Sequence, residues 1–132
     1  MALPKPYFDL AMEVTQNDPI IITMLFEDDS KNPVDIDSWD FYYTIKASLS
    51  DSDDDAVAKL RPGDAGIVKS SYPAGLGFSN RVDLILEPAA VSGLAVGTQY
   101  YHDVQVVPDD GRPYTYAKGK LVVTFEVTED GP

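Results

Sequence analysis

The chain has no cysteine, few basic residues, a single histidine and no long apolar run. Without cysteine among its 132 residues, disulfides and thiolate metal sites are excluded. Ten basic residues against 22 acidic ones leave a net charge of −12. This average field repels phosphate, so we expect neither nucleic acid nor an anionic membrane as a partner. No stretch approaches the roughly 18 consecutive apolar residues of a membrane span.

The N-terminal stretch, residues 1–14, has two prolines and an aspartate before any apolar run. That is not the pattern of a secretory signal peptide, so we expect a protein made in the cytoplasm that stays in solution. The length predicts one domain, with enough buried surface for a core without disulfides. We assign residues 1–13 to an N-terminal arm, residues 14–128 to the domain and residues 129–132 to a C-terminal tail.

Alternation of apolar and polar residues dominates the sequence, and helical periodicity is nearly absent. One face of the segment 39–46 carries Trp39, Phe41, Tyr43 and Ile45. The same alternation recurs over residues 81–87, 99–107 and 120–127. This pattern is typical of strands that turn one face toward a core.

The stretch 18–47 is the clearest structural signal. Two runs rich in β-branched and aromatic residues, 20–26 and 39–45, flank a polar segment of turn-forming residues. We expect the folding unit to begin by pairing these two strands.

Turn signals separate the strands. Residues 108–111, PDDG, predict a hairpin. Residues 118–120, KGK, predict a bend or bulge leading into the last strand. The acidic run 51–55 is expected to be an exposed loop. The one helix candidate is the segment 87–94, limited to about two turns by Gly93.

Short strands separated by turns at intervals of roughly 8–12 residues predict an all-β fold. We expect an immunoglobulin-like β-sandwich with one short connecting helix. A small closed barrel is the alternative.

The residues offer little catalytic chemistry. His102 lies in the middle of a strand, on the same face as Val104, and its neighbour Asp103 points to the opposite face. A catalytic triad needs both an acid and a nucleophile within reach of the histidine. We interpret His102 as a residue that lines the core, and we expect no enzyme activity.

Acidic residues between the first two strands are the best metal candidates. Asp28, Asp29, Asp35 and Asp37 supply carboxylates at short spacing. The segment lacks the glycine and terminal glutamate of an EF-hand loop. Because turns also use these residue types, we treat calcium as a weak candidate and expect no cofactor.

Four tyrosines are candidates for a protein interface. Tyr42 and Tyr101 fall on the faces opposite the core residues of their strands, and Tyr114 and Tyr116 alternate in the same way. They predict a second apolar face that packs on another subunit. Ordinary strand surface is the alternative.

An ordered set of segments resembles a known family. An aliphatic strand after Asn17-Asp18, the turn NPVDI at 32–36 and the aromatic strand FYYTIK at 41–46 come first. The strand VDLIL at 82–86, the segment GTQYYHDVQV at 97–106 and the end of the chain, 111–123, follow. Together they resemble phage tail immunoglobulin-like modules, of the kind found at the N-terminus of the baseplate upper protein of tailed phages. Lys31-Asn32 stands where the family has glycine, and His102 where it commonly has tyrosine.

The resemblance, which spans about residues 14–127, implies a non-enzymatic structural and assembly protein of a phage or prophage tail. Its expected partners are other tail or baseplate proteins and further copies of itself, and its expected location is the virion tail. The baseplate proteins continue into receptor-binding parts, whereas this chain ends at Pro132, so we expect a ring subunit or an adaptor. The alternative is an immunoglobulin-like binding module for carbohydrate or a cell-surface ligand, with Tyr72, Phe78 or Tyr114 in an aromatic platform.

Overall fold

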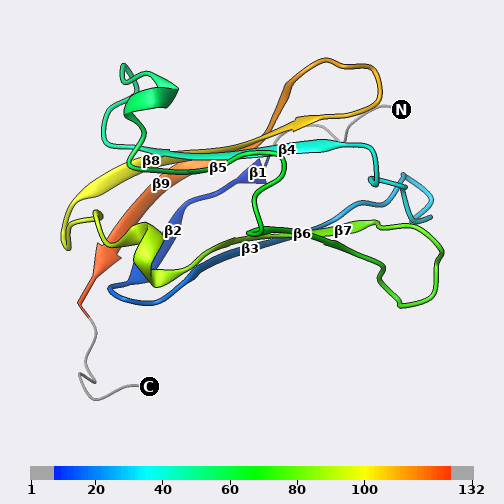
Figure 1. Cartoon of the computed structure of the whole chain (residues 1–132), viewed down its shortest axis with the longest axis horizontal. Coiled ribbons are helices and arrows are strands. Elements are labelled where there is room, and N and C mark those ends of the chain that lie inside the picture. Colours follow the sequence, from blue (N-terminus) through cyan, green and yellow to red (C-terminus); the bar gives the residue numbers. More distant parts are fainter. Residues whose placement is uncertain (1–7, 126–132) are drawn as a thin grey trace.

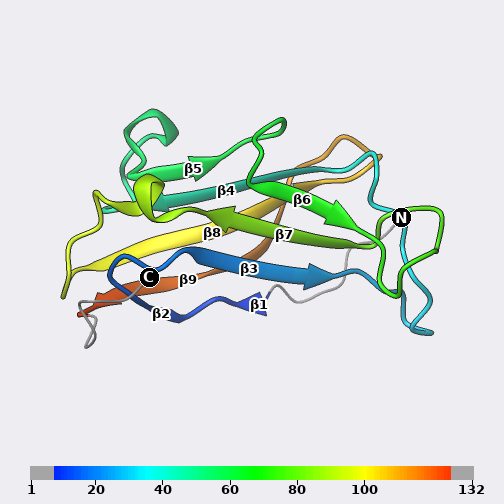
Figure 2. The same ribbon diagram turned by 60° about the horizontal axis from the view of Figure 1, so that its bottom comes forward.

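The computed structural model describes residues 8–125, whose strands form two sheets packed face to face (Figures 1 and 2). Sheet A has six strands: β1 (Phe8–Asp9), β2 (Met12–Thr15), β4 (Asp40–Lys46), β5 (Ala58–Leu60), β8 (Gln99–Val107) and β9 (Tyr114–Thr124). Sheet B has three: β3 (Ile20–Leu25), β6 (Ile67–Ser70) and β7 (Arg81–Leu86). The order is β1-β9-β8-β4-β5 in sheet A, with β2 also on β9, and β3-β7-β6 in sheet B.

This architecture confirms the predicted all-β sandwich over the closed barrel, because no hydrogen-bonded ladder joins the two sheets within residues 8–125. The core between them is aliphatic and aromatic. Its largest fully buried side chains include Trp39, Tyr43, Phe26, Phe41 and Ile36. None of the described helical segments is long and apolar enough to cross a membrane.

The expected pairing of the first two long strands is wrong. β3 pairs with β7 in sheet B, whereas β4 pairs with β5 and β8 in sheet A. The connector between them crosses from one layer to the other and buries Val34 and Ile36 on the way. The backbone of Ile36 donates to the Ser79 carbonyl, so the connector bonds with a distant loop and does not close a hairpin.

β8 and β9 form the predicted hairpin, but the irregularity lies elsewhere than at residues 118–120. The register shifts between Val104 and Gln105, which pair with Ala117 and Thr115, so Tyr116 is the extra residue. β9 runs unbroken through Gly119.

The N-terminal segment belongs in part to sheet A, so the arm expected over residues 1–13 is too long. β1 and β2 both run parallel to β9 and are separated by a break at Leu10 and Ala11. The segment passes so close to β9 that a Cβ atom on Gly119 would lie 2.6 Å from the Leu10 carbonyl carbon and the Ala11 nitrogen. The tail assigned to residues 129–132 lies outside the described residues.

The predicted connecting helix is a single 3₁₀ turn, η2 (Pro88–Val91). Its end is fixed by the Ser92 hydroxyl, which donates to the Ala89 carbonyl, and by Gly93, which weakens any continuation. A second 3₁₀ turn, η1 (Asp53–Asp55), forms inside the exposed acidic loop. The Ser52 side chain accepts from the Asp55 amide at its start.

Candidate functional site

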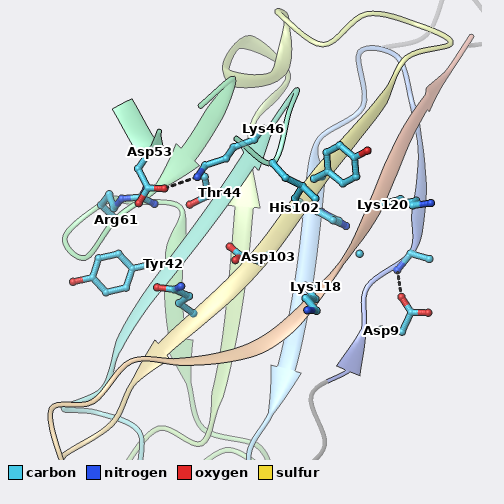
Figure 3. Close-up of a pocket in the computed structure, with 15 residues that line it drawn as sticks. Asp9, Tyr42, Thr44, Lys46, Asp53, Arg61, His102, Asp103, Lys118 and Lys120 are labelled. Atoms are coloured by element: carbon cyan, nitrogen blue, oxygen red, sulfur yellow. Dashed lines mark hydrogen bonds and ion pairs between the residues drawn. The ribbon is translucent and has the colours of Figure 1, made fainter. Parts of the chain in front are cut away.

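A hollow with a volume of about 730 Å³ lies on the outer face of sheet A (Figure 3). The strands of this sheet expose alternate residues, and their register sets them side by side. Three cross-strand rows make the floor: Lys46–Tyr101–Lys120, Thr44–Asp103–Lys118 and Tyr42–Gln105. The loop around η1 and the N-terminal segment at Asp9 and Ala11 border it on opposite sides.

One wall of the hollow is held by an ionic network around Asp53. Lys46 Nζ lies 2.9 Å from Asp53 Oδ1, and Arg61 Nη2 lies 3.6 Å from Asp53 Oδ2. The Lys46 hydrogen bond, together with the nearby cations, lowers the pKa of Asp53. Arg61 also donates to the backbone carbonyl of Tyr43 at 3.1 Å, and its guanidinium lies 5.6 Å from the centre of the Tyr42 ring. Arg61 therefore contacts that ring at one end of the hollow and favours its position there.

Asp103 lies at the centre of the floor, between Tyr42 on one side and Lys118 on the other (Figure 3). Partial burial raises the pKa of this carboxyl, although Lys46, Arg61 and Lys118 act in the opposite direction. Its neighbour Thr44 is only 9% exposed despite facing outward. The floor is thus partly shielded from water, and its carboxylate is less well solvated than a surface aspartate.

The hollow is locally basic within an acidic chain. Its lining residues include four of the ten lysines and arginines, Lys46, Arg61, Lys118 and Lys120, against three aspartates, Asp9, Asp53 and Asp103. The rest of the chain therefore carries all of the net negative charge. An anionic group is repelled less here than elsewhere on the molecule.

The four tyrosines predicted to form an interface separate in the structure. Tyr42 and Tyr101 lie half-buried on the outer face of sheet A, as expected, and both line the hollow. Tyr116 does not lie on that face: it is 5% exposed, with its ring centre 5.0 Å from that of Phe26. The bulge at Tyr116 turns it inward. Tyr114 is half-buried, and its hydroxyl donates to Asp110 at 2.7 Å.

The interpretation of His102 as a core residue is confirmed. The side chain is 3% exposed, and both ring nitrogens have partners. Nε2 lies 2.7 Å from the Leu10 carbonyl oxygen, which only accepts, so Nε2 carries the proton. Nδ1 then accepts from the Tyr43 hydroxyl at 2.7 Å. Burial lowers the pKa of His102, and an imidazole committed at both nitrogens is not available as a general base.

Three of the four calcium candidates accept hydrogen bonds from backbone amides. Asp28 Oδ1 accepts from the Ser30 and Asn32 amides, both at 2.9 Å, and these bonds outweigh desolvation and lower the Asp28 pKa. Asp35 accepts from the Asp37 amide, and Asp37 accepts from the Ser79 amide. Asp29 is exposed beside them. Across residues 8–125, no three acidic or histidine side chains come together as metal ligands would.

The aromatic platform suggested for carbohydrate does not coincide with the hollow. Tyr72 is 57% exposed and Phe78 is partly buried, both in the loop that joins β6 to β7. Neither residue lines the hollow, and neither does Tyr114.

Sequence reasoning missed the polar residues of the hollow: Thr44, Lys46, Arg61, Asp103, Gln105, Lys118 and Lys120. A signal was present, because Thr44, Lys46, Asp103 and Gln105 alternate with the core residues of β4 and β8. The alternation identifies an outer face, but only the strand order brings these residues together.

Comparisons with known proteins leave the family open. No protein-family model matches the chain, and no curated protein matches it either.

Proposed function

We propose that the chain is a non-enzymatic structural and assembly protein of a phage or prophage tail, in the baseplate or a tail ring, acting through protein–protein contacts. It would be made in the bacterial cytoplasm and built into the virion tail. The ordered resemblance described above supports this proposal. So does the commitment of the single histidine to core hydrogen bonds.

One observation carries the proposal: apolar side chains are exposed on the outer face of sheet B, which no other strand among residues 8–125 covers (Figure 2 shows the sheet from this side). Ile21 is 53% exposed, Leu25 38% and Val68 41%, and Ile85 is partly exposed beside them. Single exposed apolar side chains are ordinary, but these four lie on adjacent strands, with Ile21 paired directly to Ile85. We call this surface the apolar face.

The centre of the apolar face is polar, and its three polar side chains contact one another. Thr23 Oγ1 donates to Asp83 Oδ1 at 2.5 Å, and Arg81 Nη2 lies 3.4 Å from the same oxygen. One arginine and one aspartate cancel, so the face has no net charge.

A second copy of the chain is the occupant that we propose for the apolar face, because the neutral charge of this face permits the contact. Two copies that each carry −12 repel one another wherever acidic surfaces meet. The apolar face is neutral, and it would bury Ile21, Leu25 and Val68 without bringing unpaired aspartates together. A homo-oligomer, as in a tail ring, is the assembly that this surface fits.

The test is the mass in solution as a function of concentration, measured by light scattering on the full chain. We expect reversible association that Ile21→Ser and Leu25→Ser abolish. Leu49→Ser is the matched control, because Leu49 is 75% exposed but lies on the side of sheet A. A strictly monomeric wild type, or equal dissociation by Leu49→Ser, overturns the contact. The tail assignment is tested separately: neighbouring reading frames that encode no tail or capsid protein would refute it.

A further inference from the structure

We infer that the hollow on the outer face of sheet A is a saccharide-binding site, with a polar floor that binds sugar hydroxyls and tyrosine rings that pack against the sugar. This goes beyond the proposed assembly role and uses the opposite sheet from the apolar face.

The floor offers hydrogen-bonding groups that the fold leaves uncommitted. Within residues 8–125, no hydrogen bond reaches the Thr44 hydroxyl, the Asp103 carboxylate or the Gln105 amide. They belong to neighbouring positions of β4 and β8, with Thr44 paired directly to Asp103. One hydroxyl, one carboxylate and one amide supply both donors and acceptors, which is what the vicinal hydroxyls of a sugar need.

Water only partly hydrates two of these groups. Thr44 is 9% exposed and Asp103 is partly buried, so each has lost part of its hydration without gaining a protein partner. A ligand that hydrogen-bonds to them therefore displaces little water and supplies partners that the fold itself does not.

Aromatic rings stand on the same face as these polar groups. Tyr42 is paired with Gln105, and Tyr101 lies in the row of Lys46 and Lys120. Arg61 holds the Tyr42 ring from one side. A ring fixed in this way presents apolar surface at low entropic cost, and its hydroxyl remains a further polar contact.

The chemistry of the hollow argues against other small ligands. A floor of Thr44, Asp103 and Gln105 is too polar for a lipid tail. Although the lysines and Arg61 of the hollow reduce the repulsion of an anion, the carboxylate of Asp103 at the centre of the floor disfavours a polyphosphate. Its volume of about 730 Å³ lies within the roughly 300–1,000 Å³ typical of small-ligand sites and suits a short oligosaccharide.

The test begins with the full chain on a printed array of neutral, amino and uronic-acid glycans. The glycan with the strongest signal is then titrated into ¹⁵N-labelled protein. We expect amide shift changes along 42–46, 101–105 and 118–120. The class of glycan that binds identifies the chemical class of the natural ligand. Amide shift changes in these three segments support the site for any of the glycan classes.

Variants separate the hollow from the rest of the surface. Tyr42→Ala and Gln105→Ala should each weaken binding about five- to ten-fold. Tyr72→Ala is the matched control, since Tyr72 is exposed but lies outside the hollow, and it should leave the affinity unchanged. A blank array, shifts confined to other segments, or full affinity in Tyr42→Ala and Gln105→Ala overturns the inference. The mass in solution should be the same in all three variants, so failure here is distinguishable from failure of the apolar-face contact.

Discussion

Gly119 is the point at which a single methyl group should detach the N-terminal strands. The backbone of the segment between β1 and β2 passes directly over it. The Cβ of an alanine would lie 2.6 Å from the Leu10 carbonyl carbon, 2.6 Å from the Ala11 nitrogen and 2.9 Å from the Leu10 oxygen. All three are backbone atoms, so no side-chain rotation relieves the clash and the segment itself has to move.

The expected cost follows from what that movement breaks. Forcing an extra methyl into a packed site costs about 1–3 kcal/mol. Moving Leu10 also lengthens the 2.7 Å bond from His102 Nε2 and leaves a buried donor unpaired, about 1–3 kcal/mol more. Alanine also restricts the conformations of the unfolded chain, which offsets about 0.4–1 kcal/mol of this loss. The net for Gly119→Ala is a loss of about 3 kcal/mol, roughly 10 °C in Tm for a chain of this size.

The assay is urea unfolding followed by the emission of Trp39, the single tryptophan, which is 2% exposed in the folded protein. Hydrogen exchange locates the damage, because the Leu10 amide donates to Lys118 and the Gln16 amide to Thr124, both at 2.8 Å. These two amides should lose protection first. Gly93→Ala is the matched control: its added Cβ has its nearest neighbour at 3.8 Å, so no loss is expected.

The reasoning would be refuted by a Gly119→Ala protein whose urea midpoint matches that of Gly93→Ala. Unchanged protection of the Leu10 amide would be equally damaging. Either result would mean that the close approach of the N-terminal segment to β9 does not fix its position.

Three further predictions concern buried and half-buried polar groups. Burial holds the pKa of His102 below 6.5, so as the pH falls the imidazole is protonated in the unfolded chain before it is protonated in the folded chain. The contribution of neutral His102 to stability is therefore complete above about pH 6.5 and is lost as the pH falls through the folded-state pKa. An NMR titration of this single imidazole should show a midpoint below 6.5, and a higher midpoint would contradict the argument. Asn80→Ala should cost about 2–4 kcal/mol in urea unfolding, because buried Asn80 bonds both the amide and the carbonyl of Tyr72, at 2.7 and 2.8 Å. Asp103→Asn should raise the Tm at pH 7, since a raised folded-state pKa means that ionised Asp103 destabilises the fold, and a fall in Tm would count against this.

The strands were predictable where alternation is strong. The core face of β4, with Phe41, Tyr43 and Ile45, follows from sequence period alone, and β8 begins and ends at the expected residues, 99 and 107. β5 and β6 were missed. With three and four residues, they are too short to show a period.

Partner choice between strands was not predictable from local pattern. β3 and β4 look like a hairpin because a polar segment separates them, yet buried Val34 and Ile36 make that segment a crossing between layers. Two apolar residues among aspartates and a single proline are a weak local signal. The position of the bulge depends on the pairing of β8 with β9, so Tyr116 was expected outside and lies inside.

The hollow was predictable only in part, for the same reason. Tyr42 and Tyr101 were correctly placed on outward faces, but their common hollow follows from β4 and β8 being neighbours. Arg61 lies in the turn that follows β5, and nothing in the spacing of the two residues along the sequence predicts its contact with Tyr42. The lining residues of the hollow are brought together by the pairing of strands that are distant in sequence, which the composition does not reveal.

Asp103 links the stability of the fold to the proposed binding. Burial and the nearby carboxylate of Asp53 raise its pKa even though Lys46, Arg61 and Lys118 attract the ionised form, so desolvation together with Asp53 outweighs three nearby cations. A sugar hydroxyl that donates to the carboxylate favours the ionised form and must lower that pKa. By reciprocity, saccharide affinity should rise as the pH increases through the pKa of Asp103 and level off once the group is ionised. A sheet that served only as a spacer would gain nothing from a carboxylate in this position, whereas a site for sugar hydroxyls gains an acceptor for which water competes poorly.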